Sequence, residues 1–166
     1  MRTMSSIEYI ERLSMNPHFH GLLLQVFLSG YNKPCEVRMA FMALPILMYS
    51  ESREKLASAK STSKMETLFN TPDALENNVK ISGKLKLAGF SERYSQIRPL
   101  CKKALIILYS EKKIVMNQNK IVIVETKKYS NYKGNVREWL KAAHYLGVIF
   151  SKTNEEYINY FLGVDS

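Results

Sequence analysis

Three histidines and two cysteines are the residues of this chain best suited to bind a metal ion or to act as a nucleophile. His18 and His20 lie two positions apart in a segment typical of a helix, which separates them by about 200° around its axis. Metal ligands on a helix need a spacing of three or four residues, and no such pair includes either histidine. His144 lies far along the chain, so only the fold could bring it near. We therefore expect the histidines to be packing or surface residues.

The cysteines and the remaining polar residues form no catalytic motif. Cys35 and Cys101 lie in separate elements without CxxC spacing, so we expect free, partly buried thiols in a reducing cytosol; a disulfide or a reactive thiol is the alternative. The sequence holds no GxxxxGK[ST] loop, GxGxxG turn, GxSxG elbow or HExxH helix. We therefore expect a protein that is not an enzyme and has no metal site and no cofactor.

The positive feature of the sequence is its charge. A net charge of +9 predicts acidic partners, either nucleic acid or an acidic protein surface. Two segments gather basic residues and are candidate nucleic-acid or partner contacts: Arg53, Lys55, Lys60 and Lys64 between helices, and Lys127, Lys128, Tyr129, Tyr132 and Lys133 after a predicted hairpin. The second mixes lysine with aromatic rings, which suits nucleic-acid backbones and exposed bases. The alternative for both segments is a solvated loop.

The size and composition indicate one globular domain. The chain has 166 residues, 46% of them apolar and 23% charged, and we assign residues 1–166 to a single domain. No apolar run approaches the roughly 20 residues that span a bilayer, and the N-terminus lacks the apolar core of a signal peptide. The sequence therefore predicts a cytoplasmic protein without a membrane partner.

The hydrophobic pattern predicts helices for most of the chain. Asn16 followed by Pro17 is an N-cap with proline at the first helical position, and this helix should run to about Gly30 with most of its surface buried. Further helices are expected over 35–49, over 99–110 from Pro99, over 135–150 with Asn135 as cap, and after a capping box of Thr153 and Glu156. Residues 71–73 predict the start of one more helix.

Only one segment has a strong strand pattern. Residues 114–116 and 121–124 are rich in β-branched side chains and flank an Asn-Gln-Asn turn, which predicts a β-hairpin. The expected fold is mainly α with one β-hairpin, in a compact helical domain. The order of helices and hairpin is compatible with a winged-helix fold whose wing is the hairpin. The candidate recognition helix is then 61–69, which offers only Lys64 for DNA contact.

Four sequence blocks together resemble a known family. They are "MNPHFHGLLLQVFLSGY" (15–31), "ALPILMYSESREKLASAKSTSKMETLF" (43–69), "RPLCKKALIILYS" (98–110) and "KAAHYLGVIFSKTNEEYINYFLGV" (141–164). Their order and spacing are similar to the middle component of bacterial ABC-three-component systems, including Lamassu-type phage defence. The match is weak over 71–97, and the ending "GVDS" replaces a continuation usually containing proline.

The resemblance implies a non-catalytic adaptor. Such a subunit would join an SMC-like (Rad50-like) ABC ATPase that senses DNA to an effector, often a nuclease, and hold the effector inactive until infection. DNA would then be an indirect partner, reached through the complex. Two alternatives stay open: a stand-alone winged-helix DNA-binding regulator, which should carry a recognition helix rich in Arg, Asn and Gln, and an RNA-binding accessory protein based on the Lys/Tyr segment.

Overall fold

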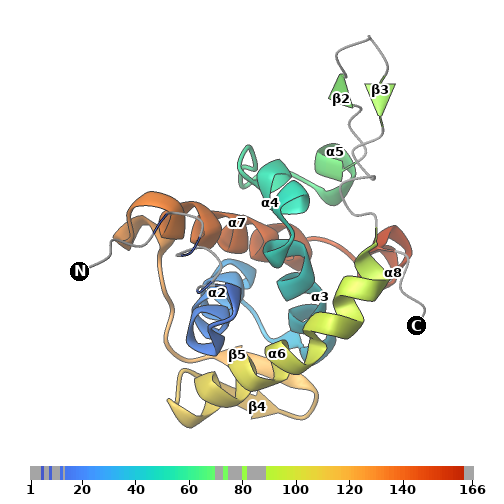
Figure 1. Cartoon of the computed structure of the whole chain (residues 1–166). Helices are drawn as coiled ribbons and strands as arrows, with labels where there is room; N and C mark the ends of the chain where they lie inside the picture. Colours follow the sequence, from blue (N-terminus) through green and yellow to red (C-terminus); the bar gives the residue numbers. More distant parts are fainter. Residues whose placement is uncertain are drawn as a thin grey trace.

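The computed structural model describes residues 14–69, 73–74, 80–81 and 89–162, together with Ser5, Glu8 and Arg12. In chain order the elements are α2 (Pro17–Tyr31), β1 (Cys35–Glu36), α3 (Val37–Met48), α4 (Ser50–Leu56), α5 (Met65–Phe69), β2 (Asp73–Ala74), β3 (Lys80–Ile81), α6 (Phe90–Ser110), β4 (Ile114–Asn117), β5 (Lys120–Ile123), the 3₁₀ turn η2 (Tyr129–Asn131), α7 (Gly134–Ser151) and α8 (Glu155–Leu162). The fold is mainly α with one hairpin, as the sequence predicts (Figure 1).

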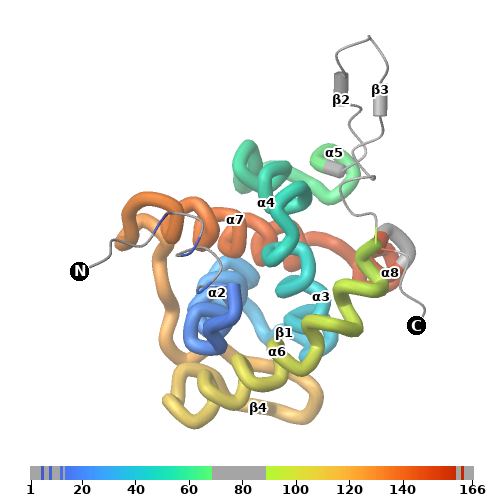
Figure 2. The backbone as a smooth tube through the Cα atoms, viewed as in Figure 1, coloured from blue at the N-terminus to red at the C-terminus, as the bar shows by residue number. Residues whose placement is uncertain are grey.

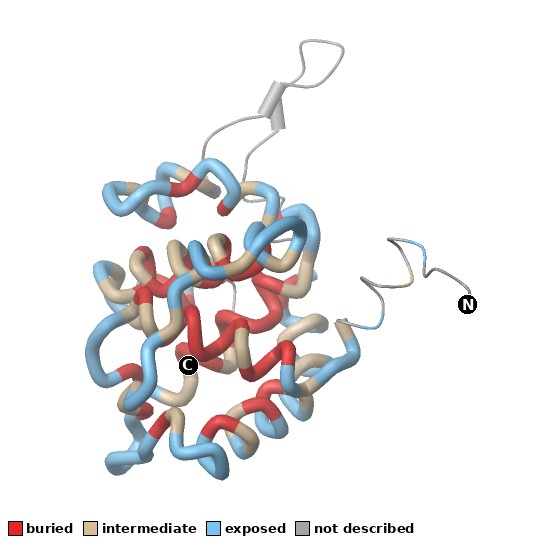
Figure 3. The backbone as a smooth tube through the Cα atoms, turned by 90° about the vertical axis from the view of Figure 1, so that its left-hand side faces the viewer, coloured by how far each residue is buried: buried red, intermediate tan, exposed pale blue. Residues whose placement is uncertain are grey.

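Helix α2 is the centre of the core. Its start follows the sequence signal, because the Asn16 side-chain oxygen accepts a hydrogen bond from the His18 backbone N–H at 2.9 Å and Pro17 occupies the first turn. Helices α3, α6 and α7 surround it (Figure 2). Coloured by burial, the chain shows its buried positions gathered in the interior, inside exposed outer turns (Figure 3). The predicted buried helix is therefore confirmed.

Helices α2 and α7 cross with their backbones in contact. A Cβ atom added to Gly30 would lie 2.1 Å from the His144 carbonyl oxygen, and one added to Gly147 would lie 2.0 Å from the Phe27 carbonyl oxygen. No side chain fits at either position, so glycine sets the distance between the two helices. Beside this crossing, the Phe27 and Phe150 rings pack edge to face at 5.7 Å.

The sheet contains a strand that the sequence did not predict. Strands β4 and β5 form the expected antiparallel hairpin, and β1 pairs antiparallel with β5, so the strand order is β1-β5-β4. A short strand after α2 that pairs with the second hairpin strand is consistent with winged-helix topology. Compared with a winged-helix domain, this chain has the elements from α4 to β3 as an insertion. The helix directly before the hairpin, which would be the wing, is α6 and not the predicted 61–69.

Several predicted helix boundaries are wrong. Helix α6 begins at Phe90, with Pro99 inside it, and Gly89 precedes it at a φ of +73°. Residues 35–36 belong to β1, and α3 starts at Val37 and runs through Pro45. Helix α7 starts one residue before Asn135 without a side-chain cap.

Two predicted helix starts fail in different ways. Asn154, not Thr153, caps α8: its side-chain oxygen accepts from the Glu156 N–H at 2.8 Å. Residues 73–74 do not open a helix; they pair with 80–81 as short strands, while 70–72 lie outside the described residues.

Candidate interaction surfaces

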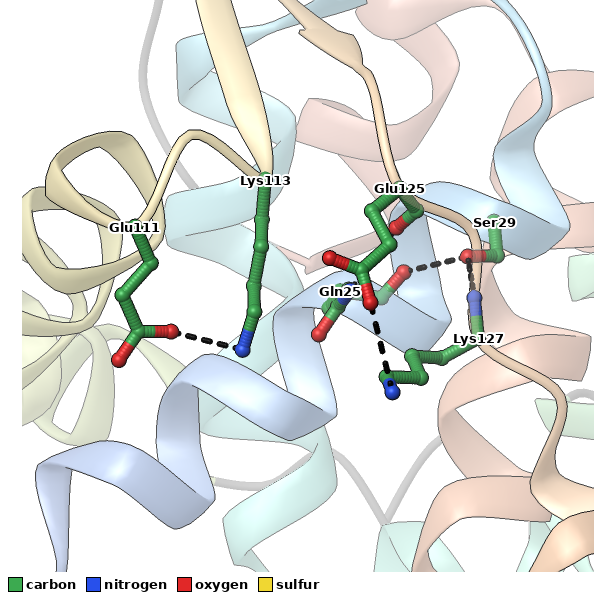
Figure 4. Close-up of polar contacts among 6 residues, drawn as sticks. All are labelled: Gln25, Ser29, Glu111, Lys113, Glu125 and Lys127. Carbon is green, nitrogen blue, oxygen red and sulfur yellow. Dashed lines mark hydrogen bonds and ion pairs between the residues drawn. The ribbon is translucent and has the colours of Figure 1, made fainter.

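The segment after the hairpin is attached to α2 by two hydrogen bonds, and a third within α2 orients one of the groups involved. The Gln25 side-chain amide donates to the Glu125 carbonyl oxygen at 2.8 Å, and the Lys127 backbone N–H donates to the Ser29 hydroxyl at 3.0 Å (Figure 4). The Ser29 hydroxyl in turn donates to the Gln25 carbonyl oxygen at 2.7 Å. Gln25 is buried, so its amide stabilises the attachment of this segment. The start of the basic segment therefore has a fixed position on the core.

Within this basic segment the lysines and the tyrosines have different surroundings. Lys128 and Lys133 are exposed, whereas Lys127 is partly buried, with its ammonium 3.5 Å from a Glu125 carboxylate oxygen. The Tyr129 ring packs against His144 at 5.3 Å, and its hydroxyl lies 3.4 Å from that of Tyr145. Tyr132 also packs against the core. Tyr129 thus holds the segment against α7, and the exposed Lys128 and Lys133 are accessible to a partner.

A hollow of about 320 Å³ lies beneath this segment. It is lined by Ser29, Thr126, Lys127, Lys128, Tyr129, Ser130 and His144. Burial lowers the pKa of His144, which disfavours the charged imidazolium in this hollow. The positive charge at the hollow therefore comes from Lys127 and Lys128.

The first basic cluster is partly taken up by internal contacts. The Arg53 guanidinium lies 3.6 Å from the centre of the Trp139 ring and donates to the Leu47 carbonyl oxygen at 2.8 Å. Burial lowers the pKa of Arg53, which remains charged because its reference value is so high. Lys55 is partly buried, while Lys60 and Lys64 are exposed. Arg53 therefore connects α4 to α7, and only the two exposed lysines present their full side chains to solvent.

The two basic clusters do not form one surface. Arg53 packs on Trp139 and Tyr129 packs on His144, and both of these partners lie on α7. Five residues along a helix turn by about 140°, so the two contacts fall on different faces of α7. A partner reaching both clusters would have to wrap around this helix.

The histidines occupy three separate environments. His18 is exposed, His20 is fully buried, and His144 is partly buried beside Tyr129, so the opposite orientation expected for the first two is confirmed. His20 Nε2 donates to the Ser14 carbonyl oxygen at 2.7 Å, and Nδ1 has no partner among the described residues. Burial lowers the pKa of His20 more than this hydrogen bond raises it. The neutral Nε2–H tautomer is therefore the form that fits the site.

The buried His20 and the partly buried His144 predict a loss of stability in mild acid. The pKa values of His20 and His144 are lowered in the folded protein, so below pH about 6.5 the unfolded chain binds more protons than the folded one. The free energy of unfolding should then fall as the pH drops from about 6.5 toward the folded pKa values. Urea unfolding at a series of pH values tests this, and H20Q and H144Q should each flatten the profile. An unchanged profile in both variants, matching that of the control H18Q, would contradict the assignment.

Both cysteines are free and fully buried. The prediction of free thiols is confirmed, and the two side chains are more deeply buried than the partial burial that was expected. Burial raises the pKa of Cys35 and of Cys101 to about 12. The Cys101 thiol donates to the Ala40 carbonyl oxygen at 3.6 Å. Because the thiolate is the reactive form, these cysteines are inert packing residues.

The sequence reasoning missed the most apolar exposed surface. Among the described residues, the large hydrophobic side chains that are strongly exposed are Met15, Ile106, Tyr109, Val115, Met116 and Val124, and all except Met15 lie in α6, the hairpin or the residue after it. Residues 90–124 also carry seven lysines and arginines against two glutamates, which is +5 of the chain's net +9. The sequence signal that could have revealed this surface is the run "KKALIILYS" (102–110), which has more apolar residues than one buried helix face requires.

The comparisons with known proteins give one match. A family model described as ABC-three component (ABC-3C) system Middle Component 3 matches residues 4–166. No curated protein and no solved structure matches the chain. Among the described residues, no helix is both long and apolar enough to cross a bilayer.

Proposed function

Because the chain belongs to the Middle Component 3 family of ABC-three component systems, we propose that it is the non-catalytic adaptor of a defence complex. It links an SMC-like (Rad50-like) ABC ATPase, which senses DNA, to an effector protein, for which a nuclease is our first candidate. It restrains the effector until infection activates the ATPase. The family match carries this proposal, since it leaves only the first three residues of the chain outside it.

The alternative function, a stand-alone winged-helix DNA-binding regulator, draws support from the position of α6 directly before the hairpin. A helix that reads bases should present Arg, Asn or Gln along its exposed side. Helix α6 does expose Gln96 and Arg98, but its last two turns expose Ile106 and Tyr109, both more than half accessible. Apolar groups at this place favour contact with a protein, and we therefore prefer the adaptor.

Co-expression with the proteins encoded beside it tests the adaptor function. We expect the chain to co-elute in size-exclusion chromatography with an ABC ATPase and with an effector. We also expect the purified effector to be less active toward DNA in the complex than alone. Elution of this chain apart from every neighbouring product would overturn the proposal.

A matched measurement separates adaptor from regulator. Duplex DNA affinity is determined for the chain alone and for the complex by fluorescence anisotropy. The adaptor function predicts that specific DNA binding requires the ATPase. Tight, sequence-specific binding by the chain alone, with no assembly, would establish the regulator instead.

A further inference from the structure

We infer that the exposed side of α6 and the outer face of the hairpin form a docking surface for another protein component of the system. We call this surface the α6–hairpin face and define it by Ile106, Tyr109, Val115, Val124, Lys102 and Lys103. Its occupant is a protein surface with apolar side chains at its centre and carboxylates around them. The inference rests on the proposed function and adds the place of contact and the chemistry of the partner.

The strand register places Val115 and Val122 on the outer side of the hairpin. Ile114 pairs with Ile123 and Met116 with Ile121, and the buried Ile114 and Ile121 turn this side of the hairpin toward the core. Val115 pairs with Val122, so both point to the opposite, outer side. Val124 follows β5 directly, is 58% exposed, and its N–H donates to the Lys113 carbonyl oxygen at 2.9 Å. Val115 and Val122 are therefore neighbours on the outer face of the hairpin, where Val115 is exposed and Val122 is partly buried.

The last turns of helix α6, directly before the hairpin, add two larger exposed apolar groups. Ile106 and Tyr109 are three residues apart, so they are neighbours on one side of the helix, and they are 58% and 59% exposed. The hairpin follows α6 directly, and the Lys113 N–H donates to the Leu108 carbonyl oxygen at 2.9 Å. Strand β5 is anchored on its other side by β1. The two parts of the surface therefore have a fixed relation before a partner binds, which lowers the entropic cost of association.

The charges around the apolar groups specify an acidic partner. Lys102 and Lys103 are exposed on α6, and Lys120 is exposed at the hairpin tip. Glu111 is already engaged by Lys113, whose ammonium lies 2.7 Å from its carboxylate. An apolar centre with lysines around it matches the usual arrangement of a protein interface, with a dry centre and a charged rim. Duplex DNA would satisfy the lysines but would leave the valines, Ile106 and Tyr109 without apolar partners.

Two sets of variants test the two halves of the surface in the assembled complex. The apolar set combines I106Q, Y109Q, V115T and V124T, which keep helix and strand propensity. Its control is M15Q, because Met15 is 70% exposed and lies outside the surface. The charge set combines K102E and K103E. Its control is R12E with R137E, the same charge change at exposed positions outside the surface and outside both basic clusters. Circular dichroism and melting temperature verify that every variant is folded.

We expect the apolar set to weaken assembly with the other components at least about tenfold at both low and high salt. The charge set should weaken assembly by about tenfold at low salt, with a much smaller effect at high salt, because exposed charges are screened. Both controls should assemble within about twofold of the wild type. This pattern would support the docking surface and its acidic partner.

Other outcomes overturn the inference in distinguishable ways. If the wild type assembles and the apolar set assembles equally well, the surface is not the docking site, while the proposed function stands. If the wild type does not assemble at all, both fail. If the charge set instead loses duplex DNA affinity, with the slope of log K against log salt reduced by about 0.9 per lost contact, the occupant is DNA. If sedimentation shows a wild-type dimer that the apolar set makes monomeric, the occupant is a second copy.

Discussion

Replacing Gly30 or Gly147 by alanine should destabilise the protein by at least about 3 kcal/mol each, the largest stability effect we expect from a single methyl group. At both positions the added Cβ would lie about 2 Å from a backbone carbonyl oxygen of the facing helix. A side chain could rotate away from such a clash, but a helical carbonyl can move only with its helix. The α2–α7 crossing would therefore have to open, and the core packed between these helices would loosen with it.

The chain supplies a matched control on the same helix. Gly21 is also buried in α2, but a Cβ there would lie 3.7 Å from its nearest neighbours, which is ordinary contact. G21A should therefore stabilise the protein by about 0.5–1 kcal/mol, because alanine is the better helix former. Urea unfolding followed by circular dichroism measures all three variants. Equal stability of G30A, G147A and G21A would show that the two helices do not cross at this distance.

Replacing Arg53 by alanine should lower the free energy of unfolding by about 2 kcal/mol. The guanidinium stacks on Trp139 and donates a hydrogen bond to the Leu47 carbonyl oxygen, and both interactions are lost together. R53K should lose most of the same stability, because an ammonium cannot provide the planar stacking and the fixed fork of donors. K60A, at an exposed position of the same cluster, should stay within about 0.5 kcal/mol of the wild type.

A double-mutant cycle separates this structural role from a role in ligand contact. If Arg53 acts through Trp139, the effects of R53A and W139L on the free energy of unfolding should be less than additive by about 0.5–2 kcal/mol. Purely additive effects, together with a loss of DNA or partner affinity in R53A at normal stability, would instead return Arg53 to the binding residues.

The sequence by itself determined the features that depend on neighbours along the chain. The Asn16–Pro17 start of α2 needs only the N–H groups of the next turn, and the observed bond to the His18 N–H confirms it. The hairpin over 114–123 also forms between adjacent runs of β-branched residues. The opposite sides taken by His18 and His20 follow from helix geometry alone. The mainly α fold with one hairpin could therefore be predicted.

The tertiary structure decided the features that depend on distant partners. β1 has two residues and exists because β5, far along the chain, pairs with it. Helix α6 extends through Pro99 back to Phe90, whose side chain is buried in the core, while Arg93 lies 3.7 Å over the Tyr49 ring. Sequence charge placed Arg53 and Lys60 in one cluster, yet the fold directs Arg53 onto Trp139 and leaves Lys60 in solvent. Local sequence patterns specify the backbone conformation, whereas long-range packing decides which side chains are covered. That packing alone left the side chains of the α6–hairpin face exposed.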